Sequence, residues 1–358
     1  MVRKTFAIMS LLALLLVQLG GAVSPVKAAQ CSAQQGELLI EAGQYKQAIQ
    51  EFTCVINAQP TEAEGYRGRI EAQLVLGRYS DALGDCSRIT ALVTPVHPDA
   101  QDIILSHYTD RLAAAPQDIH ALTGASFMRW CFYQYNPAIH LLNQLLDVHP
   151  NSVYGNLFRG SSRLLQGVTR AKGVADLEYA LALAPQSADV RFIIADAYTY
   201  GLPDPQRAFA EASLALDWGL DTPRVHAILA ASYNAFGNQL AAADHIQTHI
   251  EFVTTEWIPA SPILPDTTFE LDLVPGRTYK IPVSATAGQT ISIATSSPDF
   301  WDTILVLLAP DGTPVVGSDD ANAYFAAIEW NAGETGTYLL QVTSFESVST
   351  GVLVVTRD

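Results

Sequence analysis

The chain carries the hexapeptide Gly43-Gln-Tyr45-Lys-Gln-Ala48 and, 34 residues later, its variant Gly77-Arg-Tyr79-Ser-Asp-Ala82. After each copy apolar side chains recur at helical spacing until Pro60 or Pro95 ends the unit. Antiparallel helices approach closely only where one side chain is nearly absent, which the alanine provides. The preceding glycine permits a tight turn between the two helices. One pair cannot bury its own apolar face, so successive pairs are expected to stack.

Later units keep this pattern, although the spacing between them varies. Small residues recur at Ala138, Gly173, Ala208 and Ala242, and the last two are again 34 residues apart. The distance from Ala82 to Ala138 is 56 residues, which leaves room for one extra helix near residues 99–115. The sequence therefore predicts six helix pairs and a lone helix between the second and third pairs.

A 34-residue period of paired helices resembles the tetratricopeptide repeat. The resemblance implies an all-α solenoid whose first helices line a concave groove that binds a protein or peptide. The residues expected to line it are Arg67, Glu71, Phe127, Trp130, Phe158, Ile193, Tyr200 and Asn234. For Trp130 and Phe158, packing between helices is an equal alternative. The lysine and asparagine set with which some relatives hold a terminal carboxylate is not evident.

In the last ninety residues the helical spacing of apolar side chains gives way to short β-rich runs. Three prolines within residues 257–265 end the helical half, and about eight short β-rich runs follow, separated by Gly and Pro breakers. This pattern predicts an antiparallel β-sandwich. The segments Ala287-Gly-Gln-Thr-Ile-Ser-Ile, Pro310-Asp-Gly312 and Gly336-Thr-Tyr338, with Asp302 and Asp319-Asp320, resemble the bacterial pre-peptidase C-terminal domain. The resemblance implies a jelly-roll-like sandwich, found on secreted proteins and sometimes calcium-binding; no peptidase domain precedes it here.

Aspartates in neighbouring predicted loops of this sandwich could supply the oxygen ligands that calcium requires: Asp299, Asp302, Asp311, Asp319 and Asp320. The alternative is that they form turns and keep the surface soluble. No other cofactor is indicated. The histidines of His245-Ile-Gln-Thr-His249 lie one helical turn apart, but two ligands without the glutamate of a zinc protease favour a solvated helix face.

The N-terminus has the pattern of a secretory signal peptide. Arg3 and Lys4 precede an apolar run, residues 8–19, and Val26-Lys27-Ala28 offers a small-residue cleavage site. The predicted organisation is a signal peptide (1–28), a helical repeat domain (29–254), a Pro-rich linker (255–265) and a β-sandwich (266–358). After cleavage no membrane segment remains, so an extracytoplasmic protein is expected, whether periplasmic, at the cell surface or in the medium. An uncleaved N-terminal anchor is the alternative.

Four cysteines lie early in this exported chain, which favours two disulfides. Cys31 falls early on the first predicted helix and Cys54 late on the second, and antiparallel helices bring those ends together. We therefore favour a Cys31–Cys54 bridge, which leaves Cys86 with Cys131. Buried reduced thiols are the alternative.

The junction between the two halves poses a packing problem. Ile246, Ile250 and Val253 form an apolar stripe on the last helix, and no later helix covers it. We expect Trp257, Ile258 and Leu264 of the linker to fold back over this stripe as a cap.

The net charge and the absence of catalytic motifs limit the classes of function that the sequence allows. With 36 acidic against 20 basic residues, a net charge of −16 argues against nucleic acid and anionic membrane partners. No nucleophile elbow, P-loop, zinc-protease or dinucleotide fingerprint occurs. The prediction is a non-enzymatic scaffold that binds a protein or peptide. The alternatives are a glycan or cell-wall binder that uses Phe300, Trp301, Tyr324 and Phe325 of the sandwich, or a targeting subunit of a secreted peptidase.

Overall fold

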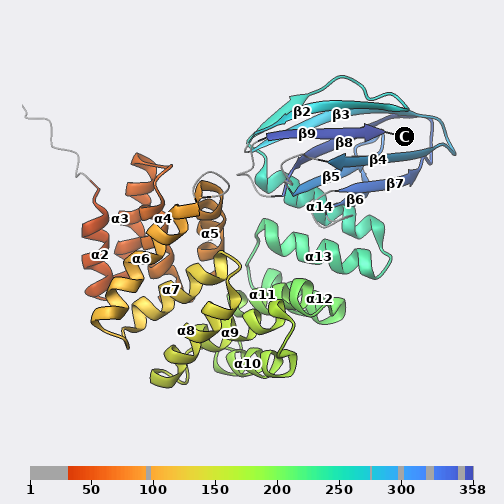
Figure 1. Cartoon of the computed structure of the whole chain (residues 1–358). Coiled ribbons are helices and arrows are strands. Elements are labelled where there is room, and N and C mark those ends of the chain that lie inside the picture. Colours follow the sequence, from red (N-terminus) through yellow and green to blue (C-terminus); the bar gives the residue numbers. More distant parts are fainter. Residues whose placement is uncertain are drawn as a thin grey trace, which may run out of the picture.

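The computed structural model describes residues 31–93, 98–274, 276–296, 302–319, 326–345 and 351–357, and the signal peptide prediction lies outside them. In these ranges a curved array of helices leads into a β-sandwich (Figure 1). The predicted fold class, a helical repeat solenoid followed by an all-β domain, is confirmed.

The α-helices are α2 (Ala33–Glu41), α3 (Tyr45–Ala58), α4 (Ala63–Val75), α5 (Tyr79–Val93), α6 (Pro98–Ala114), α7 (Ile119–Cys131), α8 (Tyr135–Val148), α9 (Val153–Gln166), α10 (Arg170–Leu183), α11 (Ala188–Asp196), α12 (Pro205–Asp217), α13 (Pro223–Ala235) and α14 (Gln239–Val253), and a π-turn η1 (Ala197–Gly201) follows α11. The strands are β1 (Glu256–Pro259), β2 (Thr267–Leu273), β3 (Arg277–Ala285), β4 (Thr290–Ser296), β5 (Thr303–Leu308), β6 (Pro314–Ser318), β7 (Ala327–Asn331), β8 (Gly336–Ser344) and β9 (Gly351–Arg357).

The helices pair as the sequence predicts. The helices form six antiparallel pairs: α2/α3, α4/α5, α7/α8, α9/α10, α11/α12 and α13/α14. The lone helix α6 lies between the second and third pairs, within one residue of the predicted range. Ala48, Ala82, Ala138 and Ala242 are fully buried where paired helices meet. Side chains of Asp118, Ser152 and other polar residues cap the first helices by accepting backbone N–H bonds.

Both predicted disulfides are present. Cys31 is bonded to Cys54, with the two Cα atoms 5.7 Å apart, and Cys86 to Cys131, with the Cα atoms 5.9 Å apart. The first bridge joins α3 to the residue preceding the cap of α2. The second joins α5 to the end of α7, so it spans the position at which the lone helix is inserted.

Two sheets form the sandwich. One has the order β1-β3-β8-β5-β6 and the other β2-β9-β4-β7, and all pairings are antiparallel except that of β1 with β3. The eight strands predicted from sequence are all present in the described residues. The ninth, β1, lies within the segment predicted to be a linker: its residues pair in parallel from Glu256 with Arg277 to Pro259 with Lys280.

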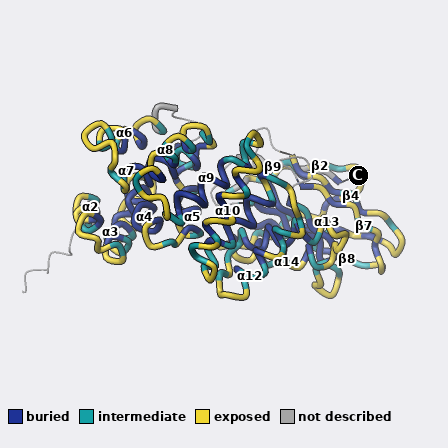
Figure 2. Tube along the Cα trace, turned by 90° about the horizontal axis from the view of Figure 1, so that it is seen from below, coloured by how far each residue is buried: buried dark blue, intermediate teal, exposed yellow. Residues whose placement is uncertain are grey.

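The stripe on α14 is covered, but not by the linker. Ile246 and Ile250 pack against Ile304, Val306 and Leu308 on the outer face of β5. The predicted cap is therefore wrong. Leu264 is 62% exposed and Trp257 is 37% exposed, whereas Ile258 packs against the sandwich core. The sheet itself closes this end of the solenoid, and buried positions continue from the helices into the β domain (Figure 2).

Candidate functional site

The helical array curls until residues far apart in sequence meet. The carboxylate of Asp189, in the first turn of α11, accepts a 2.7 Å hydrogen bond from the backbone N–H of Ser80 in the first turn of α5. An acceptor at the N-terminus of a helix satisfies a backbone donor that the helix leaves without a partner and complements its dipole. This contact joins the N-terminal arm, defined as α2 to α5, to the middle of the solenoid.

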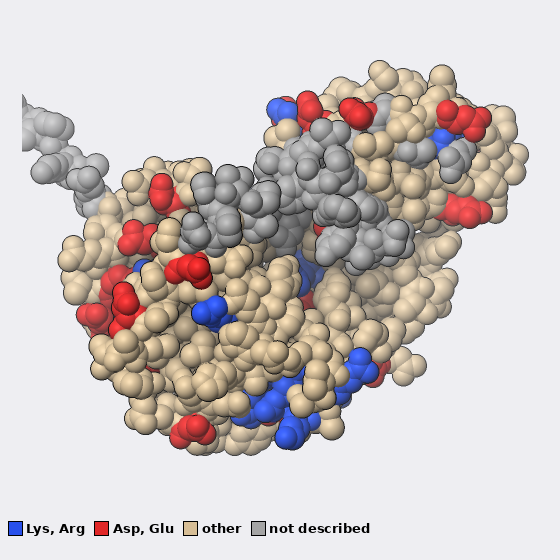
Figure 3. Space-filling model, viewed as in Figure 1, with Lys and Arg blue, Asp and Glu red and all other residues tan. Residues whose placement is uncertain are grey.

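An open cleft of about 500 Å³ lies between this arm and the domain junction. We call it the central cleft. One wall comes from α3, α4 and α5, and the other from Phe192 of α11, the start of α13, His249 and Val253 of α14, and Phe345 after β8. On the face drawn in Figure 3, acidic side chains lie on both the helical and the β parts of the molecule. The apolar part of the first wall includes Ile49 and Leu83.

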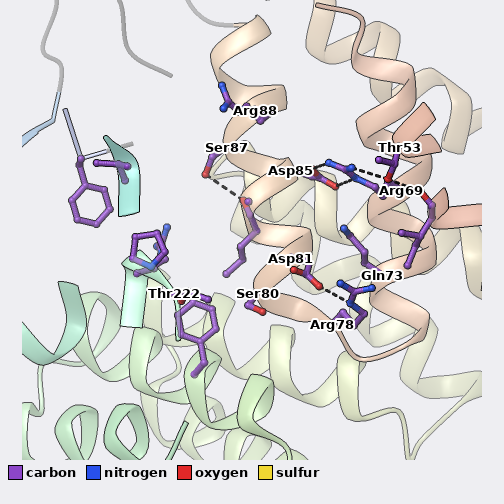
Figure 4. Close-up of a pocket in the computed structure, with 18 of the residues that line it drawn as sticks. Thr53, Arg69, Gln73, Arg78, Ser80, Asp81, Asp85, Ser87, Arg88 and Thr222 are labelled. Carbon is purple, nitrogen blue, oxygen red and sulfur yellow. Dashed lines mark hydrogen bonds and ion pairs between the residues drawn. The ribbon is translucent and has the colours of Figure 1, made fainter. Parts of the chain in front are cut away.

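Ion pairs hold the charged side chains of the cleft in place (Figure 4). Arg69 donates to both carboxylate oxygens of Asp85, at 2.8 and 2.6 Å, and to the hydroxyl of Thr53. Arg78 donates to Asp81 at 2.5 Å. Burial raises the pKa of Asp85, and Arg69 opposes this rise. The bidentate geometry therefore fixes a guanidinium plane on the wall of the cleft.

His249 connects the far wall to the β domain. Its Nδ1 lies 2.8 Å from the carbonyl oxygen of Pro223 and its Nε2 lies 2.8 Å from that of Phe345. Burial lowers the pKa of this imidazole. The sequence motif His245-x3-His249 therefore does not bring its two rings together as metal ligands. His245 instead contacts His226, with Nδ1 atoms 2.8 Å apart.

A second polar cluster lies between the N-terminal arm and α6. Glu71 is fully buried; Arg111 donates to it at 3.2 Å, and Arg67 lies 3.9 Å away. Arg67 also pairs with Glu37 at 2.5 Å. Burial raises the pKa of Glu71 to about 7 and, together with Arg67, lowers that of His107 to about 4. Arg67 and Glu71, both predicted to line the groove, thus belong to an internal ionic network.

This cluster does not fit a resident cation. Within the described ranges, Glu37, Glu71 and His107 are the one set of three His, Cys, Asp or Glu side chains whose ligand atoms lie within 4.8 Å of one another. Arg67 and Arg111 already pair with the two carboxylates. A metal ion would add positive charge beside the buried guanidinium of Arg67 and the half-buried one of Arg111, which a site of low dielectric disfavours.

The predicted apolar lining of the groove is mostly core. Phe127, Phe158 and Ile193 are at most 1% exposed, and Trp130 is 7% exposed. Phe127 and Trp130 stack at 6.1 Å and both meet Phe158 edge-on. The expectation that these side chains face an open trough is therefore wrong for the first three.

The two remaining groove residues lie apart. Tyr200 is 40% exposed, with the guanidinium of Arg224 5.7 Å from its ring, and Asn234 is exposed near the end of α13. Trp130 and Tyr200 both border a smaller hollow that adjoins the central cleft at Leu83, Ser87 and Arg224.

Of the calcium candidates, Asp299 and Asp320 lie outside the described residues. Asp302, Asp311 and Asp319 do not gather their oxygens at one point among those described. Asp311 accepts a 2.9 Å bond from the N–H of Thr313, which lowers its pKa, so it acts as a turn former beside Gly312.

No helix in the described ranges is long and apolar enough to cross a membrane. No protein-family model matches the chain, and no curated protein matches it. Solved structures with similar parts include a thermophilic tetratricopeptide repeat protein of Thermus thermophilus (22% identity, 51% of this chain and 91% of that one, TM-score 0.37). A tetratricopeptide repeat protein of Parabacteroides merdae is 15% identical over 62% of this chain and 92% of its own, with a TM-score of 0.40. The pre-peptidase C-terminal domain of a Bacillus anthracis collagenase is 18% identical over 29% of this chain and 95% of that domain, with a TM-score of 0.25.

Proposed function

We propose that the chain is a non-enzymatic, extracytoplasmic scaffold that binds a segment of another polypeptide in the central cleft. The observation that supports this most is the composition of the cleft. Four of its charged residues form two pairs, Arg69 with Asp85 and Arg78 with Asp81, and a third guanidinium, that of Arg224, pairs with Asp196; apolar side chains and open volume complete the lining. Such a surface offers buried apolar contact with oriented polar groups at its edge, as peptide-binding sites do.

The surroundings of the cleft support binding rather than chemistry. Among the described residues that line the cleft, one is a histidine, His249, and both of its ring nitrogens are directed at backbone carbonyl oxygens. A general base needs a nitrogen facing the substrate. The two disulfides are typical of proteins that work in an oxidising compartment, which supports the extracytoplasmic assignment.

Gly84 provides a direct test. It lies on the wall of the cleft, and a β-carbon added there would meet no atom within 4 Å. Gly84→Trp should therefore fill the cleft without disturbing the fold, whereas Gly84→Ala adds one methyl group to the same helix position. Peptides would be selected from a random display library on the oxidised full-length protein, and their affinities measured by calorimetry.

We expect selected peptides to bind the parent and Gly84→Ala equally and Gly84→Trp at least about tenfold more weakly. Thermal melting of both variants verifies that the fold is retained. Failure to select any peptide, or equal binding by Gly84→Trp, would overturn the proposal.

A further inference from the structure

Two histidines meet between the helices of the last pair. His226 lies in the first turn of α13 and His245 lies near the middle of α14, and their Nδ1 atoms are 2.8 Å apart. The partner of His245 is thus on the neighbouring helix and not one turn along its own. Two imidazole nitrogens at one point are suitable ligands for a transition metal ion. Neither histidine lines the central cleft, so this pair is independent of the proposed function.

Asp221 orients the first of the two rings. Its carboxylate oxygen Oδ1 lies 2.9 Å from Nε2 of His226. A carboxylate accepts a hydrogen bond there, so in the neutral ring we assign the proton to Nε2, and Nδ1 presents its lone pair to His245. A carboxylate behind a histidine is the arrangement that fixes the tautomer of metal-binding imidazoles and raises their basicity.

Aromatic side chains hold both imidazoles in place. Tyr233 stacks on His245, with the ring centroids 5.5 Å apart and the planes inclined by 14°. Phe252 packs on His226 with a centroid distance of 5.9 Å. His226 is buried and His245 is half-buried, so neither ring has much conformational freedom left to lose when an ion binds. This preorganisation favours binding even with two protein ligands.

The charges around the pair favour a cation. Asp244 precedes His245 and is exposed, and Asp221 lies behind His226. The guanidinium of Arg224, the arginine nearest to His226 in sequence, pairs with Asp196. Burial, and then the neighbouring His226, lower the pKa of His245, so its ring is neutral at neutral pH. Neutral imidazole is the form that binds metal ions.

The distance between the two nitrogens favours one class of metal. Bonds between an imidazole nitrogen and a metal ion are about 2.0–2.1 Å long. Two such bonds whose nitrogens are 2.8 Å apart meet at an angle of about 85–90°. A tetrahedral zinc ion needs these atoms about 3.3 Å apart. Neighbouring ligands at right angles are typical of square-planar and tetragonal ions, which copper(II) and nickel(II) form with nitrogen and oxygen ligands.

We propose that His226 and His245 form a binding site for copper(II) or nickel(II), with Nδ1 of each ring as a ligand and water in the remaining positions. Asp221 is a positioning residue, which acts through His226. The ion takes the place of the proton that the two nitrogens share in its absence, and this proton is released to solvent. The hydrogen bond and the metal bridge are therefore alternative states of the same pair.

The test is titration of the oxidised, untagged full-length protein with copper(II) chloride at neutral pH, followed by calorimetry and electron paramagnetic resonance. We expect one copper ion per chain with a tetragonal spectrum that shows coupling to nitrogen. His245→Gln should weaken the binding of this ion at least about tenfold and remove that coupling. Asp221→Asn should weaken binding about tenfold but keep the coupling, because both rings remain as ligands. Thermal melting verifies that both variants are folded.

His140→Gln is the matched control variant. It removes a histidine from another helix, α8, where the ring contacts Gln144, and it should leave the copper affinity unchanged. Nickel(II) chloride should bind more tightly than zinc chloride, because the right angle between the ligands suits nickel. Equal copper binding by the parent and His245→Gln would overturn the inference, as would tighter binding of zinc than of nickel. The cleft proposal is tested separately by Gly84→Trp, which leaves both histidines in place.

Discussion

The two ends of the solenoid are protected in different ways. At the N-terminal end, α2 buries Ile40 in a small cluster with Phe52 but leaves Leu38 52% exposed, and the Cys31–Cys54 bridge and the ion pairs of Arg67 also hold it in place. At the C-terminal end, α14 lays Ile246 and Ile250 against the outer face of β5. The terminal face of a stacked repeat needs a cover. A disulfide and ion pairs stabilise the N-terminal end, and the β domain covers the C-terminal end.

This difference implies that the two ends respond to different perturbations. The N-terminal end should depend on redox state and pH, because a reducible disulfide and titratable side chains hold it. The C-terminal end should depend on the apolar character of a few side chains shared by two domains.

The largest effect is expected at the C-terminal end. Ile246→Asp places a charge between α14 and β5, where the parent residue is 1% exposed. We expect a loss of about 4 kcal/mol or more in the free energy of unfolding, because nothing there compensates a carboxylate. Urea denaturation followed by circular dichroism measures it. Leu264→Asp is the control, since that side chain is exposed, and a similar loss in both variants would contradict a sheet-made cap.

Removal of the disulfides tests the other end. The bridges close sequence separations of 23 and 45 residues. On loop-closure entropy, Cys31→Ala/Cys54→Ala should lower the free energy of unfolding by about 3 kcal/mol and Cys86→Ala/Cys131→Ala by about 4 kcal/mol. Denaturation with and without reductant provides the comparison. Insensitivity of the parent protein to reductant would show that these bridges do not stabilise the arm.

A pH effect of intermediate size is expected from Glu71. Its folded pKa of about 7 lies above its ordinary value of 4.5, so the native state binds more protons and stability falls as the pH rises from about 4.5 to 7. His107, whose pKa is lowered to about 4, contributes with the opposite sign below about pH 6.5. The difference between the parent and Glu71→Gln isolates the carboxyl group, and should change by about 2–3 kcal/mol between pH 4.5 and 8.

Urea denaturation at several pH values, with disulfides intact, measures this change. The matched control is Glu41→Gln, at an exposed position at the end of α2. A pH profile that Glu71→Gln leaves unaltered would mean that the carboxylate stays ionised between Arg67 and Arg111.

The smallest effect concerns the turns inside the solenoid. Tyr133→Gly should raise the free energy of unfolding by about 1 kcal/mol, because it relieves a left-handed backbone. Gly77→Ala should lower it by a similar amount, since an added β-carbon there meets no atom within 4 Å and acts on the backbone alone. Both changes are measured as shifts in the urea midpoint. A destabilised Tyr133→Gly variant would show that the exposed ring supports the fold.

Much of the architecture could be predicted because it follows from local spacing. The 34-residue period gave the helix pairs, the 56-residue gap gave α6, and antiparallel geometry gave the disulfide pairing. Strand β1 was not predicted, because Pro259 and the two prolines that follow it indicate a linker, and its parallel pairing with β3 depends on residues 21 positions away. Proline is tolerated there because β1 is an edge strand.

The apolar pattern of β5 indicates that the sheet covers α14, although the sequence analysis assigned that role to the linker. Strand β5 is buried at every position, with Leu305 and Leu307 in the sandwich core and Ile304, Val306 and Leu308 against α14. An unbroken apolar run in an antiparallel sheet indicates that both faces are covered. Likewise α7 is apolar around most of its circumference, which is typical of a helix packed on several sides and not of one lining an open groove. The cleft itself could not be predicted, because it depends on how far the solenoid curls.

The bond between Asp189 and Ser80 has a consequence for how this architecture can vary. An open-ended solenoid tolerates the gain or loss of a repeat, because each unit touches its neighbours alone. Here a hydrogen bond between residues 109 positions apart joins α5 to α11. Inserting or deleting one helical hairpin between Ser80 and Asp189 would break this hydrogen bond and change how the two walls of the central cleft face each other. The number of repeats is thus a fixed dimension of this molecule, and natural variation in length should fall in the surface loops instead.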